Sequence, residues 1–276
     1  MDNLPPLSTA YQQRFGGVAR LYGQEALTQL ANAHMTIVGL GGVGSWVAEA
    51  LARSGVGTLT LIELDDICIT NSNRQLHALA STLGQQKNAV LCARLKDINP
   101  EITVHSHEDF LTPKNLNQLI TCEHHIIIDA IDSANVKAAL AAHCIYRKQR
   151  LIMTGSSGGK IDPAQIAVND LGRTISDPLL AKVRNMLHRH YNFERNTKRK
   201  FRVDAVYSRE QMRYPQQDGS VCQNKKGMSE GVKLDCAGGF GSATMLTGSF
   251  GFMAASQAIT RYLQDCHAAK HSPSGQ

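Results

Sequence analysis

The sequence predicts an α/β fold in which helices cover both faces of a doubly wound, mostly parallel sheet. Short apolar runs of strand length alternate along the first 154 residues with longer segments of helical periodicity. A glycine-rich turn joins the first expected strand to a helix, and an acidic residue follows the second expected strand. Ligands of such sheets bind beyond the carboxyl ends of the strands, so both features are expected in one site.

The individual elements follow from the apolar periodicity. We expect strands near residues 35–38, 58–63, 103–107, 126–129 and 151–154. We expect helices near residues 23–32, 43–53, 85–98, 114–121 and 134–146. Residues 236–259 carry no charge, so hydropathy alone could suggest a membrane segment, but they hold five glycines and much Ser, Thr and Ala. A buried helix near residues 243–263 is therefore the better prediction.

The turn after the first strand reads Gly39-Leu40-Gly41-Gly42-Val43-Gly44. Its glycines let backbone N–H groups approach phosphate oxygens, and the last one lets the helix pack closely on the strand. Asp65 ends the second strand, where a carboxylate accepts hydrogen bonds from ribose hydroxyls. The strand, loop, helix and distal acid give a Rossmann-like nucleotide site, whereas a turn kept only for packing leaves Asp65 unexplained.

The polar residues downstream decide which nucleotide this site takes. The residues that follow Asp65 are polar or charged: Asn73, Arg74, Lys87 and Asp132. A dehydrogenase would instead need an apolar slot for nicotinamide. Arg74 offers phosphate a fork of donors, and Lys87 offers a point charge. Asp132 supplies the oxygen that Mg²⁺ prefers, directly or through water. The sequence therefore predicts ATP and Mg²⁺ at this site.

Composition agrees with one large domain, residues 14–265, that has an elaborated C-terminal part. The 276 residues are 42% hydrophobic, and no linker rich in Pro, Ser or Gly divides them. The seven cysteines are an odd number without regular spacing, which argues against a disulfide framework and for a reduced, cytoplasmic protein. The N-terminus has neither the charged start nor the apolar core of a signal peptide.

These positions carry a resemblance to a known superfamily. In its glycine loop, Asp65, the Asn73-Arg74-Gln75 triplet, Lys87 and Asp132, the chain resembles the ThiF/MoeB-like adenylating enzymes related to ubiquitin-activating enzyme. Within them it is most similar to the bacterial tRNA threonylcarbamoyladenosine dehydratases. That similarity is carried by residues 13–17, 162–166, 214–216 and 235–241, and it extends over residues 14–263.

The resemblance implies a reaction and a set of partners. In the dehydratases, the threonyl carboxylate of a modified adenosine beside the tRNA anticodon attacks the α-phosphorus of ATP, and ring closure by the carbamoyl group then expels AMP. The resemblance also implies a homodimer in which Arg14 reaches the phosphates of the other subunit, although Arg14 by itself reads as a surface residue. Sulfur-transfer proteins of a cysteine desulfurase system are implied as further partners.

An adenylating enzyme for a small sulfur-carrier protein is the alternative. Such relatives usually carry paired CxxC motifs for a structural zinc, and this chain has none, so we expect no zinc. Thioester-forming relatives use a cysteine, for which Cys222 and Cys236 are the candidates, but ring closure needs no thioester. A nonenzymatic or dehydrogenase-like nucleotide binder, the third class, is disfavoured by Arg74, Lys87 and Asp132.

Residues 182–202 form a basic segment with eight Lys or Arg and one acid, Glu194. Its net charge of +7 exceeds the +6 of the whole chain. We predict phosphate contacts with tRNA from Lys198, Arg199, Lys200 and Arg202, and stacking contacts from Tyr191, Phe193 and Phe201. A solvated, mobile insertion is the alternative interpretation of this segment.

Overall fold

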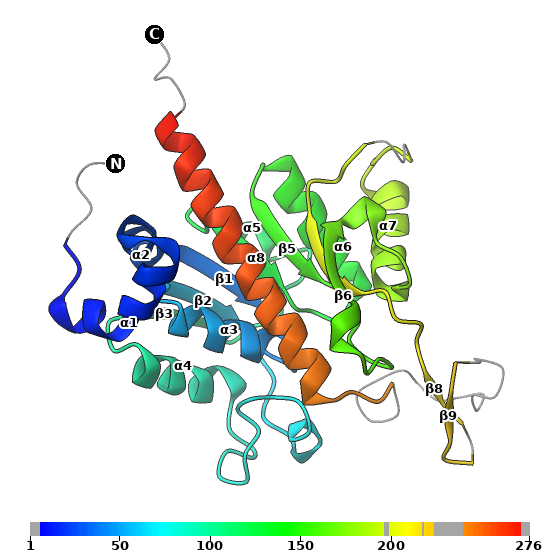
Figure 1. Cartoon of the computed structure of the whole chain (residues 1–276). Helices are drawn as coiled ribbons and strands as arrows, with labels where there is room; N and C mark the ends of the chain where they lie inside the picture. Colours follow the sequence, from blue (N-terminus) through cyan, green and yellow to red (C-terminus); the bar gives the residue numbers. More distant parts are fainter. Residues whose placement is uncertain (1–5, 196–198, 217, 224–239, 272–276) are drawn as a thin grey trace.

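A computed structural model describes residues 6–195, 199–216, 218–223 and 240–271. Within them, seven strands form one sheet in the order β3-β2-β1-β4-β5-β7-β6 (Figure 1). β6 is antiparallel to β7, and the other neighbours are parallel. The strands are β1 (His34–Val38), β2 (Thr58–Ile62), β3 (Thr103–His107), β4 (Ile126–Asp129), β5 (Arg150–Thr154), β6 (Ile166–Asp170) and β7 (Asp204–Ser208). A separate ribbon, β8 (Tyr214–Pro215) with β9 (Val221–Cys222), projects from the body.

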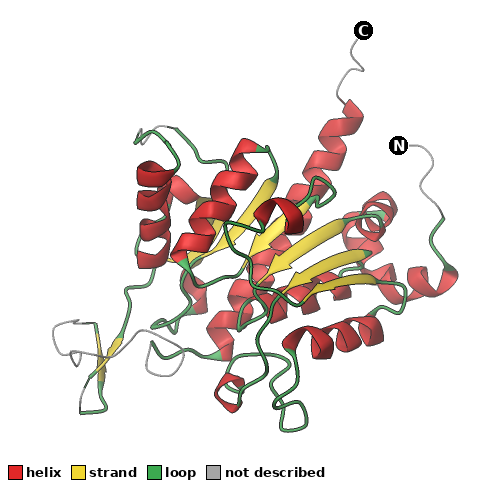
Figure 2. Cartoon of the chain, turned by 180° about the vertical axis from the view of Figure 1, so that it is seen from behind, coloured by secondary structure: helices red, strands yellow, loops and turns green. Residues whose placement is uncertain are grey.

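Helices cover both faces of the sheet, as Figures 1 and 2 show from opposite sides. One face carries α2 (Gln24–Ala31), α3 (Gly44–Arg53), α4 (Lys87–Ile98) and the long α8 (Thr244–His271), and α1 (Thr9–Tyr22) packs on α2. The other face carries α5 (Leu116–Leu119), α6 (Ala134–Tyr146) and α7 (Pro178–His190). This layering gives the sheet a carboxyl edge and an amino edge that stay open to ligands.

The strands are apolar on both faces because each face is covered. Ile126 and Ile128 of β4 point into the core under α3 and α8, whereas Ile127 between them points into the core under α6. All three side chains are fully buried. This alternation at period two explains why these strands read as continuous apolar runs in the sequence.

The five predicted strands are present, and the predicted buried helix is confirmed as α8, which extends to His271. No described helix is long and apolar enough to span a bilayer. Four observed elements, α1, α7, β6 and β7, were not expected from the sequence. Nine residues of the basic segment, 182–190, belong to α7, where Val183 and Leu187 are buried against α6. The dense surface charge of α7 obscured this apolar stripe.

Candidate active site

The glycine loop joins β1 to α3 at the carboxyl edge of the sheet. A Cβ atom at position 44 would lie 1.8 Å from the carbonyl oxygen of Gly39, and Gly39 itself has φ +86°. These two glycines are therefore required by the loop's own fold. A Cβ at Gly41 would meet nothing nearer than Gln75 Nε2 at 3.9 Å. Gly41 thus keeps open the space through which a phosphate can approach the backbone.

Glu63 fixes this loop to the end of β2. Its Oε2 accepts a hydrogen bond from the backbone N–H of Leu40 at 2.9 Å, and its Oε1 accepts from the N–H of Asp65 at 3.0 Å. The carboxylate is almost fully buried. One acidic side chain therefore sets both the start of the phosphate loop and the position of Asp65.

Lys87 begins α4 and points back at the same carboxylates. Its Nζ lies 2.9 Å from Asp65 Oδ2 and 3.8 Å from Glu63 Oε2. The lysine side chain is 6% exposed, whereas that of Asp65 is 53% exposed. Asp65 can therefore bind Lys87 with one oxygen and still offer the other to a ribose hydroxyl.

Arg74 and Asn73 are held beside the loop by their neighbours. Arg74 Nη1 donates to the carbonyl of Thr70 and to Asn73 Oδ1, both at 2.9 Å. A Cβ at Gly42 would lie 3.1 Å from Arg74 Cγ, so the arginine stem lies against the glycine loop. Trp46 Nε1 donates to the Arg74 carbonyl at 3.1 Å. Arg74 is half-buried, which lets its guanidinium face solvent at the carboxyl edge.

Asp132 lies on the turn that follows β4. Its side chain is exposed and has no hydrogen-bond partner among the described residues. Two residues earlier, the carbonyl oxygen of Ala130 would lie 3.0 Å from a Cβ at Gly39, so this turn packs directly on the glycine loop. An exposed carboxylate next to a phosphate loop has the position and chemistry of a Mg²⁺ ligand.

A buried ion pair supports that turn from below. Lys137 Nζ lies 2.9 Å from Asp129 Oδ1, and both side chains are fully buried. The same oxygen accepts from the N–H of Ile131 at 3.0 Å. Burial raises the pKa of Asp129, and Lys137 opposes that rise. The pair therefore fixes the backbone between the end of β4 and Asp132.

The structure does not bring Arg14 to this site. Arg14 Nη1 donates to the carbonyl of Ile98 at 3.1 Å, at the last residue of α4. Lys87 is the first residue of that helix, so about 16 Å of helix separates the two ends. Arg14 lies near the amino edge of the sheet, whereas the glycine loop, Asp65, Arg74, Lys87 and Asp132 lie at the carboxyl edge.

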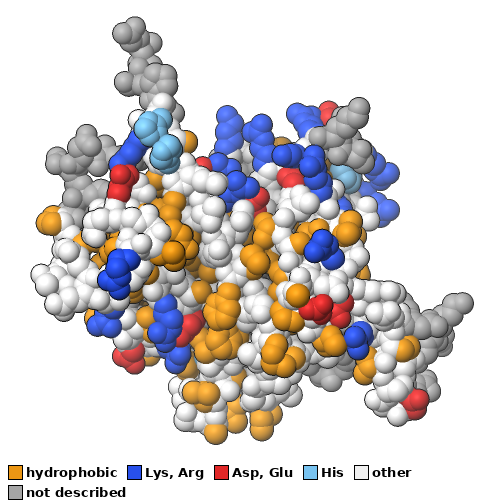
Figure 3. All heavy atoms as spheres, viewed as in Figure 1, with side chains coloured by type: hydrophobic (Ala, Val, Ile, Leu, Met, Phe, Trp, Pro, Cys, Tyr) orange, Lys and Arg blue, Asp and Glu red, His pale blue; other side chains and the backbone are white. Residues whose placement is uncertain are grey.

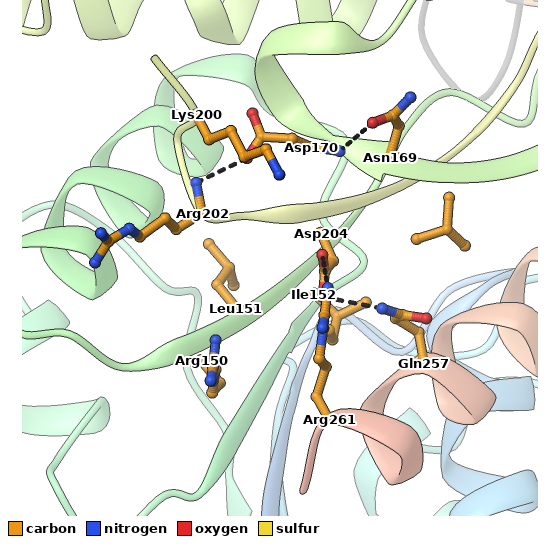
Figure 4. A pocket seen from close by; sticks show the side chains of 11 residues that line it. Arg150, Leu151, Ile152, Asn169, Asp170, Lys200, Arg202, Asp204, Gln257 and Arg261 are labelled. Atoms are coloured by element: carbon orange, nitrogen blue, oxygen red, sulfur yellow. Dashed lines mark hydrogen bonds and ion pairs between the residues drawn. The ribbon is translucent and has the colours of Figure 1, made fainter. Parts of the chain in front are cut away.

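The basic segment also reaches the amino edge. Lys200 and Arg202 line a pocket of about 420 Å³ that lies between the first residues of β5 and β7 and the end of β6 (Figure 4). In Figure 3, Lys and Arg side chains gather along this upper edge of the molecule. Arg199 is paired with Glu194 at 2.9 Å, and Lys198 lies outside the described residues. Lys200 and Arg202 are therefore remote from the glycine loop.

Comparison with known proteins now identifies the family. The model of the ThiF family matches residues 14–274. The chain belongs to the ThiF family. The tRNA threonylcarbamoyladenosine dehydratase of Escherichia coli K12 is 50% identical over 257 residues, which are 93% of this chain and 96% of that protein. The Haemophilus influenzae protein of the same name is 49% identical and covers 92% and 95%.

Solved structures agree with these relatives. The crystal structure of the Escherichia coli dehydratase in complex with ATP matches with a TM-score of 0.85 and 46% identity, covering 97% of this chain and 100% of that chain. The molybdopterin-synthase adenylyltransferase of Escherichia coli is 36% identical over 130 residues, only 47% of this chain. Similarity to these two dehydratases therefore extends over nearly the whole chain, whereas similarity to that adenylyltransferase covers about half of it.

Several features of this ThiF-family site were not predicted from the sequence. Glu63, Asp129 and Lys137 were missed, because each looks ordinary in a sequence. A signal was present for two of them, since Glu63 and Asp129 each end an apolar strand beside a predicted site residue. Lys137 lies in an alanine-rich helix, and only the fold reveals that it faces Asp129.

The aromatic side chains of the basic segment pack on one another and on the body of the protein. Phe193 and Phe201 stack on each other with centroids 5.8 Å apart, and Phe193 also packs on Tyr146. Together with Tyr191 they are half-buried against the core under α6 and α7. These rings pack on the body of the protein, and their stacking on RNA bases stays a prediction.

The candidate cysteines and the candidate metal ligand lie in different parts of the chain. Cys222 is exposed on β9, and Cys236 lies outside the described residues. Among the described residues, no group of three His, Cys, Asp or Glu side chains could hold a metal ion. A Mg²⁺ ion held by Asp132 alone would need phosphate oxygens and water to complete its shell.

Proposed function

We propose that the protein is an ATP-dependent tRNA threonylcarbamoyladenosine dehydratase of the cytoplasm. The observation that carries this proposal is the gathering of the glycine loop, Arg74, Lys87 and Asp132 at one sheet edge, in a chain 50% identical to such an enzyme. The threonyl carboxylate attacks the α-phosphorus of ATP, and the bond to pyrophosphate breaks. The carbamoyl group then attacks the acyl adenylate, loses a proton and expels AMP.

The residues contribute by binding and orientation, because this reaction needs no protein nucleophile. Backbone N–H groups of the glycine loop and of the α3 N-terminus would contact the phosphates. Asp65 would hold the ribose. Arg74 would neutralise negative charge that develops on the α-phosphate, and Lys87, on exchanging part of its contact with Asp65, would meet the same phosphates.

The site fits Mg²⁺ through Asp132. A hard divalent ion takes carboxylate oxygen, and this carboxylate is exposed at the loop and unpaired among the described residues. When bound, Mg²⁺ would neutralise charge on the pyrophosphate leaving group. The contribution of this chain is to fix the turn from residue 129 to residue 132 through the Asp129–Lys137 pair.

We propose that tRNA also contacts the amino edge through Lys198, Arg199, Lys200 and Arg202. The support is the excess positive charge of this segment and the exposure of Arg199, Lys200 and Arg202. A tRNA is long enough to contact this edge while its anticodon loop reaches an active site. Contacts with sulfur-transfer proteins stay a prediction. The described surface offers no specific support for them.

We further propose a homodimer in which Arg14 completes the active site of the other subunit. The separation of Arg14 from its own nucleotide site supports this, since only another copy could bring it there. Exposed apolar side chains on α8 support a partner as well: Met245 is 69% exposed and Phe252 is 50% exposed. Figure 3 shows apolar atoms grouped over this lower half of the molecule.

Mixed dimers test this shared site. Arg14→Ala and Asp132→Ala subunits should each be inactive alone, and mixing them should restore part of the activity, because some mixed dimers contain one intact site. Mass analysis should first establish that the subunits exchange. Exchange without any recovery of activity would overturn the shared site.

The main experiment is reaction of the purified protein with ATP, Mg²⁺ and tRNA that carries threonylcarbamoyladenosine. Mass spectrometry of the nucleosides should detect loss of one water, with AMP and pyrophosphate formed in equal amounts. The digestion must avoid hydrolysis of the ring. The sulfur-carrier alternative predicts instead that ATP is cleaved only when a small protein with a C-terminal Gly-Gly is added, and its support is the similarity over half the chain.

A further inference from the structure

Tyr214 and Phe240 form an aromatic pair at the root of the β8–β9 ribbon. Their ring centroids are 5.5 Å apart and their planes meet at 65°. Both side chains are half-buried, and neither belongs to the hydrophobic clusters formed by the described core. Tyr214 belongs to β8, which projects from the body in Figure 1, and Phe240 lies 26 positions further along the sequence. Unlike the Phe193–Phe201 stack, this pair is not built into the core.

Backbone hydrogen bonds fix the pair to the loop after β5. The N–H of Arg213 donates to the carbonyl of Gly159 at 2.7 Å, and the N–H of Gly159 donates to the carbonyl of Gly241 at 2.8 Å. A Cβ at Gly158 would lie 3.0 Å from Phe240 Cβ. The chain segments that carry Tyr214 and Phe240 are therefore both attached to the same short glycine turn.

The residue that follows this turn, Lys160, is held by buried polar contacts. The side chain of Lys160 is fully buried, with its Nζ 3.2 Å from the Ser208 carbonyl and 3.7 Å from Asp177 Oδ2. Burial lowers the pKa of Lys160. At the end of β5, the Thr154 hydroxyl donates to the Asp129 carbonyl at 3.1 Å. The aromatic pair is thus attached to the loop that follows β5, and β5 pairs with β4, the strand before the turn of Asp132.

On the Phe240 side, hydrogen bonds through Asn73 connect the chain to Arg74. Asn73 Nδ2 donates to the carbonyl of Ser242 at 2.7 Å, and Thr244 Oγ1 donates to the carbonyl of Asn73 at 2.6 Å. Asn73 in turn accepts a hydrogen bond from Arg74 at 2.9 Å. One residue, Gly241, separates Phe240 from Ser242. The pair is therefore connected through short contacts to residues on both sides of the nucleotide site.

We propose that Tyr214 and Phe240 form the surface on which the base bearing the reacting carboxylate stacks. The inference rests on the proposed function, and it adds to it the position of the RNA base. Proteins recognise single-stranded RNA loops by stacking splayed bases on aromatic side chains. Stacking fixes the plane of the base and leaves the attached carboxylate free to turn toward the α-phosphate. The amino-edge cations supply no such orientation.

Binding of two anticodon stem-loop RNAs tests this proposal without ATP. One RNA carries adenosine at the position beside the anticodon, and the other is abasic there. Phe240→Leu and Tyr214→Leu should weaken binding of the adenosine RNA about tenfold each and leave binding of the abasic RNA unchanged. Phe240→Trp should retain binding, because the stacking surface is kept. Tyr146→Leu, which removes an exposed ring at the amino edge, is the matched control.

The binding results distinguish failure of the stacking role from failure of the proposed function. Equal losses for both RNAs, or no loss for either, would overturn the stacking role. Failure of the unaltered protein to bind either RNA would instead overturn the proposed function. Calorimetric ATP affinity should stay within about twofold in all four variants, since none of the substituted rings contacts the glycine loop.

Discussion

The cations near the glycine loop and two cations of the basic segment, Lys200 and Arg202, are held in different ways. At the carboxyl edge, Arg74 and Lys87 are buried or half-buried and fixed by named acceptors. At the amino edge, Lys200 and Arg202 are exposed, and their cationic groups have no hydrogen-bond partner among the described residues. A fixed cation suits a ligand whose atoms must be placed for reaction, whereas an exposed one suits a polymer backbone that needs only charge. The difference supports the proposal that the cations at the carboxyl edge act on a bound nucleotide and that Lys200 and Arg202 contact RNA.

The strongest test of that support is the buried pair under Asp132. Lys137→Met should lower the free energy of unfolding by about 3–5 kcal/mol, because the buried Asp129 carboxylate loses its partner. Asp129 can take up a proton in response, so the loss should be smaller at low pH. Urea unfolding measures the effect, and Lys182→Met, an exposed lysine on α7, is the control. A loss below about 1 kcal/mol would contradict the assigned role.

Charge at the carboxyl edge should control the chemical step. Arg74→Ala, Lys87→Ala and Asp132→Ala should each slow pyrophosphate release about 10²-fold or more, because each removes a preorganised charge. Circular dichroism should show an intact fold, and Arg147→Ala at the amino edge should react at nearly the normal rate. Near-normal rates in all three variants would mean that the reaction occurs elsewhere on the molecule.

Charge at the amino edge should affect RNA affinity alone. The Lys200→Gln/Arg202→Gln double variant should weaken tRNA binding and flatten its salt dependence by about 0.7 to 0.9 in log-log slope per lost phosphate contact. Adding Lys198→Gln and Arg199→Gln should extend the trend. Affinity is measured from low to moderate salt, with Lys96→Gln/Lys114→Gln as a charge-matched control. An unchanged slope would assign the segment to solvated surface.

The smallest effect concerns a buried histidine near Lys87. His77 is 1% exposed, both its ring nitrogens lack partners among the described residues, and burial together with the charge of Lys87 lowers its pKa to about 4. The unfolded chain, with a pKa of about 6.5, binds a proton more readily. Stability should therefore be full above about pH 6.5 and fall as the pH drops toward 4.

His77→Leu should remove part of this dependence. The stability difference between pH 7 and pH 5 should shrink by about 1–2 kcal/mol in urea unfolding. His190→Leu, at an exposed position by the amino edge, should leave the difference unchanged. Equal slopes for the His77 variant and the unaltered protein would show that His77 titrates normally.

The sequence alone determined the elements whose apolar pattern is contained within the element itself. β1, β2 and β4 have short apolar runs, and the glycine loop carries its own steric requirement, as the 1.8 Å approach at Gly44 shows. Because parallel strands direct their carboxyl ends to one edge, the sequence also predicted that Asp65 and Asp132 lie together. α7 and β7 escaped prediction because dense charge in and between them obscured short apolar patterns.

Only the tertiary structure decided which distant residues meet. The strand order puts β5 beside β4 and β7, so the glycine turn at Gly159 comes to hold both Tyr214 and Phe240. The same order carries the basic segment to the edge opposite the glycine loop, although both are rich in polar residues. Lys137 faces Asp129 because one turn of α6 covers the end of β4. Such pairings depend on how layers stack in three dimensions, and a one-dimensional pattern of apolar spacing does not encode them.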